Sequence, residues 1–300
     1  MGASFIRMRS LFKGVTWKHP VIRLVLVCLD PLDAVIRIFN GTSKLPRLSV
    51  RVRSTGIRNE LGGRQYHKTG QFFLKILQDH ARLKAGSRVL EIGCGSGRAA
   101  LALAEFLNDG KYVGMDIEEI SLLACRSNKT LQKKKFQFDL MNIYSEEYNP
   151  KGDIEAAEYR FPYPDQSFGV IFLTSVFTHM LPDTVSNYVS EIGRMLAPGG
   201  CCLFTTFVMD AGTEGYGISF PYEARDYCLF QKTFPEKAVG YYLHYFDRIF
   251  KSARCKRFGE PILGPWRDVP VTIQYPGTDF AQDILIYKKE GSIVKKNRSL

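Results

Sequence analysis

The sequence predicts an α/β fold with a doubly wound, mostly parallel sheet. Short apolar runs alternate with helical segments of 10–13 residues between Arg88 and Met209. The first of these runs passes directly into a glycine-rich turn. Strands that are buried on both faces read as nearly continuous apolar runs, which is typical of a parallel sheet covered by helices on each side.

The individual elements follow from the spacing of the apolar residues. Phe72, Phe73, Ile76 and Leu77 are spaced as on one helix face and predict a first helix over 68–81. A strand then runs from Arg88 into the glycine turn. The further strands are expected over 111–117, 135–140, 168–177 and 201–209, with helices over 98–107, 121–133 and 184–196, and a late strand over 283–288 at or near the sheet edge.

The positive charge of the chain is concentrated near its start. Residues 1–85 hold 16 of the 41 lysines and arginines but only 4 of the 30 acidic residues, and the remainder is nearly neutral. Such an arm suits an anionic membrane, a phosphate-bearing substrate or nucleic acid, and a merely solvated basic surface is the alternative. Charges interrupt the apolar residues 21–39, so we predict two short amphipathic helices that meet near Pro31 and do not span a membrane.

The chain is expected to have three parts. Residues 1–63 form the basic amphipathic arm and an irregular connector, residues 64–290 form the α/β domain with an acceptor lid at about 210–250, and residues 291–300 form a basic tail. The seven cysteines have no CxxC or Cys/His metal-ligand spacing, so we predict reduced thiols and no metal site. A cytoplasmic protein is expected, with peripheral contact of residues 1–40 with the inner membrane face as one option.

The glycine-rich turn carries the strongest chemical signal. Glu91, Gly93, Gly95 and Gly97 have the spacing E-x-G-x-G-x-G directly after the first strand. Glycines allow a tight strand-to-helix turn and let a ligand lie against the main chain at the positive end of the next helix. Asp116 ends the second strand, where an acid can accept both ribose hydroxyls of a nucleoside. The turn and this acid together predict a nucleoside-containing cofactor.

These motifs resemble those of the class I S-adenosylmethionine-dependent methyltransferases. VLEIGCGSGR and VGMDI are similar to the family's glycine and ribose motifs, and FPYPDQSFGVIF and RMLAPGGCCLFTTF to its fourth- and fifth-strand segments. Gly169 stands where the family usually has Asp. The resemblance implies a Rossmann-like fold and S-adenosylmethionine as cofactor. It also implies cofactor contacts for six residues: Glu91, Gly93 and Gly95 on the methionine and ribose side, Asp116 at the ribose, Ile117 on adenine, and Asp139 at the adenine amino group, with a helix cap or turn former as the alternative for Asp139. Tyr66, which precedes the first core helix, is expected either to close over the cofactor or to belong to a simple connector.

His179 is the candidate catalytic residue. It follows the fourth strand, where ligands of such folds meet the carboxyl ends of the strands. A histidine has an unperturbed pKa of about 6.5 and suits removal of a proton from a hydroxyl acceptor. The alternatives are positioning of the loop or substrate, or no role at all. Tyr222, Tyr241 and Tyr242 in the lid are expected either to line the acceptor pocket or simply to pack.

Several acceptors remain open on the sequence alone. Segments such as FPYPDQSF and LTSVFTHMLPDTVSNYVSEIGRML resemble bacterial methyltransferases of surface sugars and secondary metabolites, which implies a small-molecule or glycan hydroxyl. A C-methyltransferase on a quinone- or lipid-like acceptor, or an RNA or protein methyltransferase, is the alternative, although no separate RNA-binding module is visible. We expect residues 1–40 to serve location or acceptor capture, so that a chain starting near Gly41 would still bind the cofactor.

Overall fold

The structure is a computed structural model, and it describes residues 18–55, 61–146, 148–215, 218–266 and 281–291. Parts of several predicted segments lie outside the described residues: the start of the basic arm (1–17), part of the connector (56–60), part of the lid (216–217), residues 147 and 267–280 of the α/β domain, and the tail from residue 292 onward.

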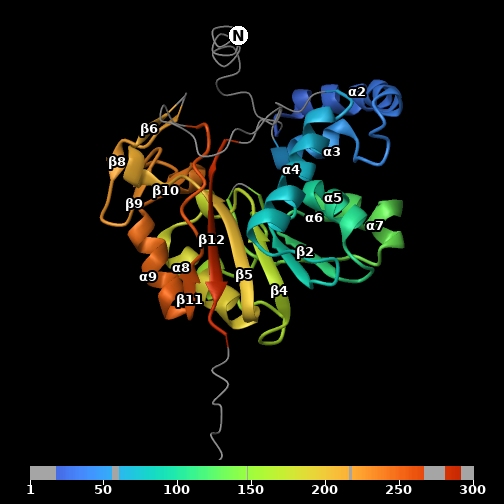
Figure 1. Cartoon of the computed structure of the whole chain (residues 1–300). Helices are drawn as coiled ribbons and strands as arrows, with labels where there is room; N and C mark the ends of the chain where they lie inside the picture. Colours follow the sequence, from blue (N-terminus) through green and yellow to red (C-terminus); the bar gives the residue numbers. More distant parts are fainter. Residues whose placement is uncertain (1–17, 56–60, 147, 216–217, 267–280, 292–300) are drawn as a thin grey trace, which may run out of the picture.

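A seven-stranded sheet forms the centre of the molecule, with strand order β11-β12-β5-β4-β1-β2-β3 (Figure 1). The strands from β3 to β5 are parallel, β12 runs antiparallel to β5, and β11 antiparallel to β12. The predicted doubly wound, mostly parallel sheet is therefore confirmed, and the late strand lies one place from the edge. The strands are β1 (Val89–Ile92), β2 (Tyr112–Asp116), β3 (Gln137–Leu140), β4 (Phe168–Leu173), β5 (Leu196–Thr206), β11 (Cys255–Arg257) and β12 (Asp283–Lys289).

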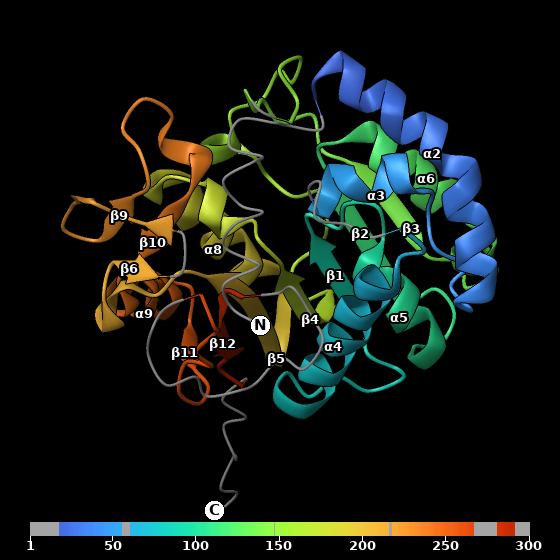
Figure 2. The same cartoon turned by 90° about the horizontal axis from the view of Figure 1, so that it is seen from above.

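Helices cover both faces of this sheet, as its buried strands require (Figure 2). Phe73 and Leu77 of α4 pack with Leu103 of α5 on one face. Ile192 of α8 and Phe246 of α9 pack on the other face. The helices of the domain are α4 (Arg64–His80), α5 (Arg98–Phe106), α6 (Glu119–Ser127), α7 (Lys129–Lys133), α8 (Pro182–Met195) and α9 (Leu243–Ser252).

The predicted helix over 121–133 is in fact two helices, α6 and α7. Asn128 lies between them with an extended backbone, and its side chain accepts hydrogen bonds from the backbone N–H groups of Thr130 and Leu131. Asparagine is a favoured N-cap, so this residue ends one helix and starts the next.

The fourth strand is also shorter than predicted. It ends at Leu173, because Ser175 adopts a left-handed backbone conformation with φ of +59°. The residues after β4 therefore leave the sheet and become available to a site at its edge.

The N-terminal arm differs most from the prediction. Helix α2 (Pro20–Phe39) continues through Pro31, and α3 (Leu48–Thr55) replaces part of the predicted connector. Asp30 accepts hydrogen bonds from the backbone N–H and the hydroxyl of Ser49, so contacts with α3 fix α2 next to the proline. None of the described helices is long and apolar enough to cross a membrane.

Small sheets and turns follow β5 and precede α9. They comprise β6 (Glu214–Gly215), β7 (Ile218–Ser219), β8 (Tyr222–Glu223), β9 (Tyr227–Leu229) and β10 (Val239–Tyr241), with the short 3-10 turns η3 (Met209–Ala211) and η4 (Pro235–Lys237). Helix α9 itself packs on the sheet, with Phe250 stacked on Tyr287 of β12 at 3.9 Å between ring centroids. The end of the predicted lid, from residue 243 onward, therefore belongs to a helix that packs on the sheet.

Candidate active site

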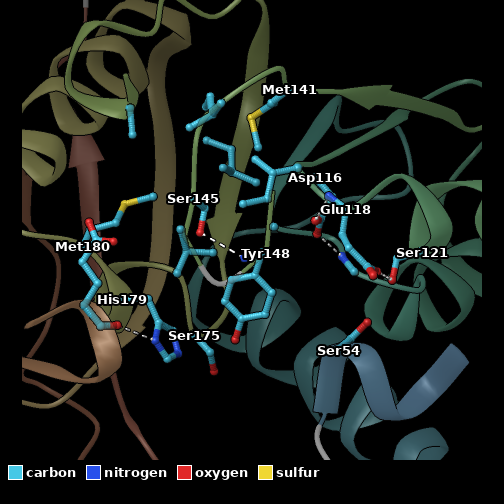
Figure 3. Close-up of a pocket in the computed structure, with 18 of the residues that line it drawn as sticks. Ser54, Asp116, Glu118, Ser121, Met141, Ser145, Tyr148, Ser175, His179 and Met180 are labelled. Atoms are coloured by element: carbon cyan, nitrogen blue, oxygen red, sulfur yellow. Dashed lines mark hydrogen bonds between the residues drawn. The ribbon is translucent and has the colours of Figure 1, made fainter. Parts of the chain in front are cut away.

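A cavity of about 230 Å³ lies at the carboxyl ends of β1, β2 and β4. The chain winds outward from β1 in one direction through β2 and in the other through β4, so the cavity lies at the switch point of the sheet. Ligands of doubly wound folds bind at this point. One half of the cavity is formed by the glycine turn, the end of β2 and α3, and the other by residues after β4 (Figure 3).

The glycine turn forms the base of the first half. Gly93 and Gly95 have φ of +78° and +51°, a region that other residues rarely adopt. A Cβ on Gly93 would lie 2.4 Å from Val176, and a Cβ on Gly95 would lie 2.6 Å from the hydroxyl of Ser54. Both neighbours line the cavity, so a side chain at either glycine would displace its wall.

Asp116 lies beside the turn at the end of β2. Its two carboxylate oxygens accept the backbone N–H groups of Gly95 at 2.6 Å and of Glu118 at 2.9 Å. Burial raises the pKa of Asp116 to about 6, although these N–H groups act in the opposite direction. Each oxygen has a second lone pair, so the ionised carboxylate can accept ligand hydroxyls as well.

The apolar wall contains one predicted residue and two that the sequence analysis missed. Ile117 lines the cavity, and so do Met141 and Ile143, which follow β3. Asp139 is not among the lining residues, and its carboxylate accepts the hydroxyl of Tyr163 at 2.5 Å. This placement argues against the predicted position of Asp139 beside adenine.

Glu91 and Tyr66 support the turn and do not line the cavity. Glu91 is 2% exposed and accepts a hydrogen bond from the hydroxyl of Tyr112. Burial raises its pKa to about 8, and the hydrogen bond from Tyr112 only partly offsets that effect. Tyr66 is also buried, with its hydroxyl 3.0 Å from that of Ser96. Direct contact of these two side chains with the cofactor is not favoured by this geometry.

Helix α3 covers the glycine turn and supplies two lining residues that the sequence analysis missed. The hydroxyl of Ser54 accepts the backbone N–H of Ser96 at 2.9 Å. Arg53 forms an ion pair with Glu118, which follows Asp116 by two residues. Arg53, Ser54 and Glu118 all line the cavity, so the N-terminal region forms part of its wall.

Helix α2 holds α3 through a buried ion pair. The guanidinium of Arg51 donates to both oxygens of Asp33, at 2.7 and 3.0 Å, and both side chains are 0% exposed. Burial would raise the pKa of Asp33, but Arg51 and the N–H of Gly62 outweigh it and lower the pKa. The expectation that residues 1–40 take no part in the cofactor site therefore needs correction, because α2 positions the helix that forms its wall.

Ser175 introduces backbone strain in the other half of the cavity, and sequence analysis had not selected it. Its N–H donates to the Thr205 hydroxyl at 2.7 Å, and its own hydroxyl donates to Gln282 at 3.0 Å. Thr205 donates to the same Gln282 oxygen at 2.7 Å. These bonds hold Ser175 at positive φ, a kind of strain that clusters at functional sites.

His179 lines the same half, on the short turn η2 (Phe177–His179). Its Nδ1 lies 3.0 Å from the backbone oxygen of Glu236. A carbonyl oxygen only accepts, so Nδ1 donates, and in the neutral ring Nε2 carries the lone pair. Figure 3 shows His179 across the cavity from Asp116.

The predicted lid aromatics are not lining residues of the cavity. Tyr241 is buried and donates to the backbone oxygen of Met180 at 2.5 Å, whereas Tyr222 is 40% exposed. Tyr242 donates to Glu223. The lining aromatics are instead Tyr144 and Tyr148, which follow β3, and Tyr188 of α8.

A family profile described as a methyltransferase domain matches residues 90–204, which run from β1 to β5. Over this part the chain is similar to class I, S-adenosylmethionine-dependent methyltransferases. Two relatives illustrate the range of this similarity. The chain is 29% identical over 140 residues to the phthiotriol/phenolphthiotriol dimycocerosates methyltransferase 1 of Mycobacterium ulcerans, covering 47% of this chain and 41% of that protein. It is 25% identical over 173 residues to the fatty-acid O-methyltransferase of Mycolicibacterium smegmatis, covering 58% and 53%.

The chain thus spans about half the length of these curated relatives. Among solved structures, a Pyrococcus horikoshii protein matches with a TM-score of 0.54 at 13% identity, covering 80% of this chain and 98% of that chain. This likeness reflects a shared fold.

The residues that line the cavity fit the predicted cofactor in their chemistry. Gly93 and Gly95 line it without side chains, Asp116 provides an acceptor for ribose hydroxyls, and Ile117 and Met141 provide apolar surface for adenine. Among the described residues, no three His, Cys, Asp or Glu side chains are grouped as a metal site.

Proposed function

We propose that the methyltransferase transfers a methyl group from S-adenosylmethionine to a hydroxyl group of a small-molecule, glycan or lipid-like acceptor. The single observation that carries this proposal is His179, whose Nδ1–H is held by the Glu236 carbonyl on the side of the cavity opposite Asp116. This hydrogen bond favours the tautomer in which Nε2 can accept a proton. A relative that is named a fatty-acid O-methyltransferase supports oxygen as the methylated atom.

The residues of the cavity would divide the work as follows. Bound S-adenosylmethionine supplies an electrophilic methyl group on a positively charged sulfur. Asp116 would hold the ribose, and the backbone at Gly93 and Gly95 would leave room for the rest of the cofactor. Nε2 of His179 would take the proton of the acceptor hydroxyl as its oxygen bonds to the methyl carbon, while the carbon–sulfur electron pair stays on sulfur.

A carbon acceptor in a quinone- or lipid-like molecule is the second candidate. The relative named for phthiotriol and phenolphthiotriol dimycocerosates favours a lipid-like acceptor without naming the methylated atom. A carbon already activated by its own phenolate or enolate needs no histidine base. An RNA or protein acceptor, for which the basic arm is the support, comes third. Cytoplasmic placement with peripheral membrane contact also remains part of this proposal.

The test is transfer of isotope-labelled methyl groups to a panel of a fatty acid, a hydroxylated lipid, a glycan, a quinol and RNA. We expect label on an oxygen of a small or lipid-like acceptor, located by mass spectrometry. Label on carbon would move the assignment to the second candidate, and label on RNA alone would overturn both.

A further inference from the structure

Helix α2 presents an apolar surface to the outside of the molecule. Eight of its large apolar side chains are at least half exposed, among them Phe39 at 85%. These residues recur at helical spacing along the whole 20-residue helix, and we call them the outer face of α2: Val21, Leu24, Val25, Val27, Leu32, Val35, Ile38 and Phe39. A surface helix normally turns its apolar stripe toward the core.

Three of the four charged residues of α2, namely Asp30, Asp33 and Arg37, face the protein instead. Asp33 is fully buried in its ion pair with Arg51. The carboxylate of Asp30 accepts hydrogen bonds from the backbone N–H and the hydroxyl of Ser49 on α3. The guanidinium of Arg37 donates hydrogen bonds to the carboxylate of Asp33 at 2.9 Å and to the backbone oxygen of Leu45 at 2.6 Å. These contacts fix the rotation of the helix, so the outer face cannot turn inward without breaking the buried pair.

An exposed apolar face of this extent indicates a surface that is covered in use. The helix is about 30 Å long at 1.5 Å per residue, so its outer face could lie flat in a membrane interface. Arg23 is the one exposed Lys, Arg, Asp or Glu within α2, and the helix does not meet the requirements of a membrane span.

The charge that precedes α2 in the sequence selects the kind of membrane. Residues 1–19 contain Arg7, Arg9, Lys13 and Lys18 and no acidic residue, and Arg23 follows on the exposed side of α2. Basic residues that flank an interfacial helix are attracted to anionic lipid headgroups. A second copy of this chain would gain nothing from this one-sided charge.

We propose that the outer face of α2 docks on an anionic membrane, with the helix lying in the plane of the headgroups. Helix α2 lies at the end of the molecule where the parallel strands terminate, next to α3, which lines the cavity (Figure 1). Docking would therefore bring the cavity close to the membrane, where a lipid-like acceptor resides. The docking surface itself does not depend on which acceptor is methylated.

Sedimentation of the full chain with vesicles tests this proposal. Vesicles of mixed phosphatidylglycerol and phosphatidylcholine should bind the protein, and pure phosphatidylcholine should bind it at least about tenfold more weakly. The variants Leu24→Glu and Ile38→Glu, each measured separately, should weaken binding about tenfold or more, because a carboxylate would enter the apolar interface. Added salt should weaken binding through screening.

Phe258→Glu is the matched control, because Phe258 is a 38% exposed apolar residue after β11 at the other edge of the sheet. It adds the same charge and should leave vesicle binding unchanged. Cofactor binding by all three variants reports that they are folded. Equal vesicle binding by wild type and both α2 variants would overturn the proposal. Self-association without vesicle binding, lost in the α2 variants, would assign the surface to a second copy and also overturn it.

Discussion

At the scale of single residues, His179 is the side chain whose role most affects the proposed chemistry. If the acceptor is a hydroxyl and His179 is the base, His179→Ala should lower kcat by about 10²–10⁴-fold with little change in cofactor affinity. His179→Gln keeps hydrogen bonding but cannot accept a proton at neutral pH. The readout is kcat against pH, in which the wild type should show a limb that both variants lose. Near-normal activity of the Gln variant would contradict the base and support positioning.

The raised pKa of Asp116 predicts a pH dependence of cofactor binding. Ribose hydroxyls donate to the ionised carboxylate, which is present above a pKa of about 6. Affinity for S-adenosylhomocysteine should therefore be constant above that pH and fall as the pH drops, approaching about tenfold per pH unit. Calorimetric titrations from acid to neutral pH check this. If the affinity of the Asp116→Asn variant fell with the same slope as the pH drops, a group other than Asp116 would be responsible for the pH dependence.

Glu91 predicts a different pH effect, on stability. The pKa of Glu91 is about 8 in the folded protein, above the 4.5 of an unperturbed glutamate. As the pH rises from about 5 to 8, Glu91 therefore loses its proton in the unfolded chain while it keeps it in the folded protein, and the free energy of unfolding falls. Glu91→Gln can still accept the Tyr112 hydrogen bond and removes this slope. The variant should match the wild type near pH 4.5 and be more stable at pH 8, by on the order of 3 kcal/mol. Denaturant unfolding of the ligand-free protein at both pH values is the measurement. An equal change in the free energy of unfolding between the two pH values for wild type and variant would contradict this role of Glu91.

At the scale of elements, the buried pair between α2 and α3 predicts coupling of the N-terminal region to the cofactor. Asp33→Ala leaves Arg51 without its buried partner and should cost about 3–5 kcal/mol of stability. The same variant should also weaken cofactor binding, because α3 places Ser54 and Arg53 in the wall of the cavity. Replacing both residues, as Asp33→Leu with Arg51→Met, should restore much of the stability.

The exposed pair of Lys75 and Asp79 on α4 offers a control for that variant. Asp79→Ala should change stability by less than about 1 kcal/mol, since exposed ion pairs contribute little. Equal effects of Asp33→Ala and Asp79→Ala would contradict the role given to the buried pair. Normal cofactor binding by a truncated chain that starts at Gly41 would also contradict the role given to the buried pair.

Sequence patterns predicted the sheet well, because continuous apolar strands and a glycine turn are local signals. They missed elements that depend on tertiary contacts. The segment 48–55 alternates apolar and polar residues and contains two valines, which hides the helix α3 that forms over the glycine turn. Pro31 suggested a break in α2, but contacts of Asp30 and Asp33 with the neighbouring segment keep the helix continuous.

The same limit applies to the site. The glycines, Asp116, Ile117 and His179 line the cavity as their motif positions suggested. Asp139 has a similar motif position, but its neighbour Tyr163 comes from a distant segment that no local pattern reveals. Ser175 was missed because its conformation depends on Thr205 and on Gln282, more than a hundred residues away.

At the scale of the whole molecule, two surfaces combine. The cavity at the switch point of the sheet brings the proposed cofactor half and the proposed acceptor half together. Helix α2 contributes on both sides, because its inner residues hold the cavity wall and its outer face is apolar. In the proposed account, the fold therefore links the proposed methyl-transfer site to the proposed membrane-docking surface.

The most direct test of this account is calorimetric titration of the folded full chain with S-adenosylmethionine and S-adenosylhomocysteine. We predict micromolar dissociation constants for both ligands, and an Asp116→Ala variant weakened by roughly 1.5–3 kcal/mol, or about 10- to 100-fold. A folded protein that binds neither ligand, or that binds NAD in their place, would contradict the assignment of the cavity.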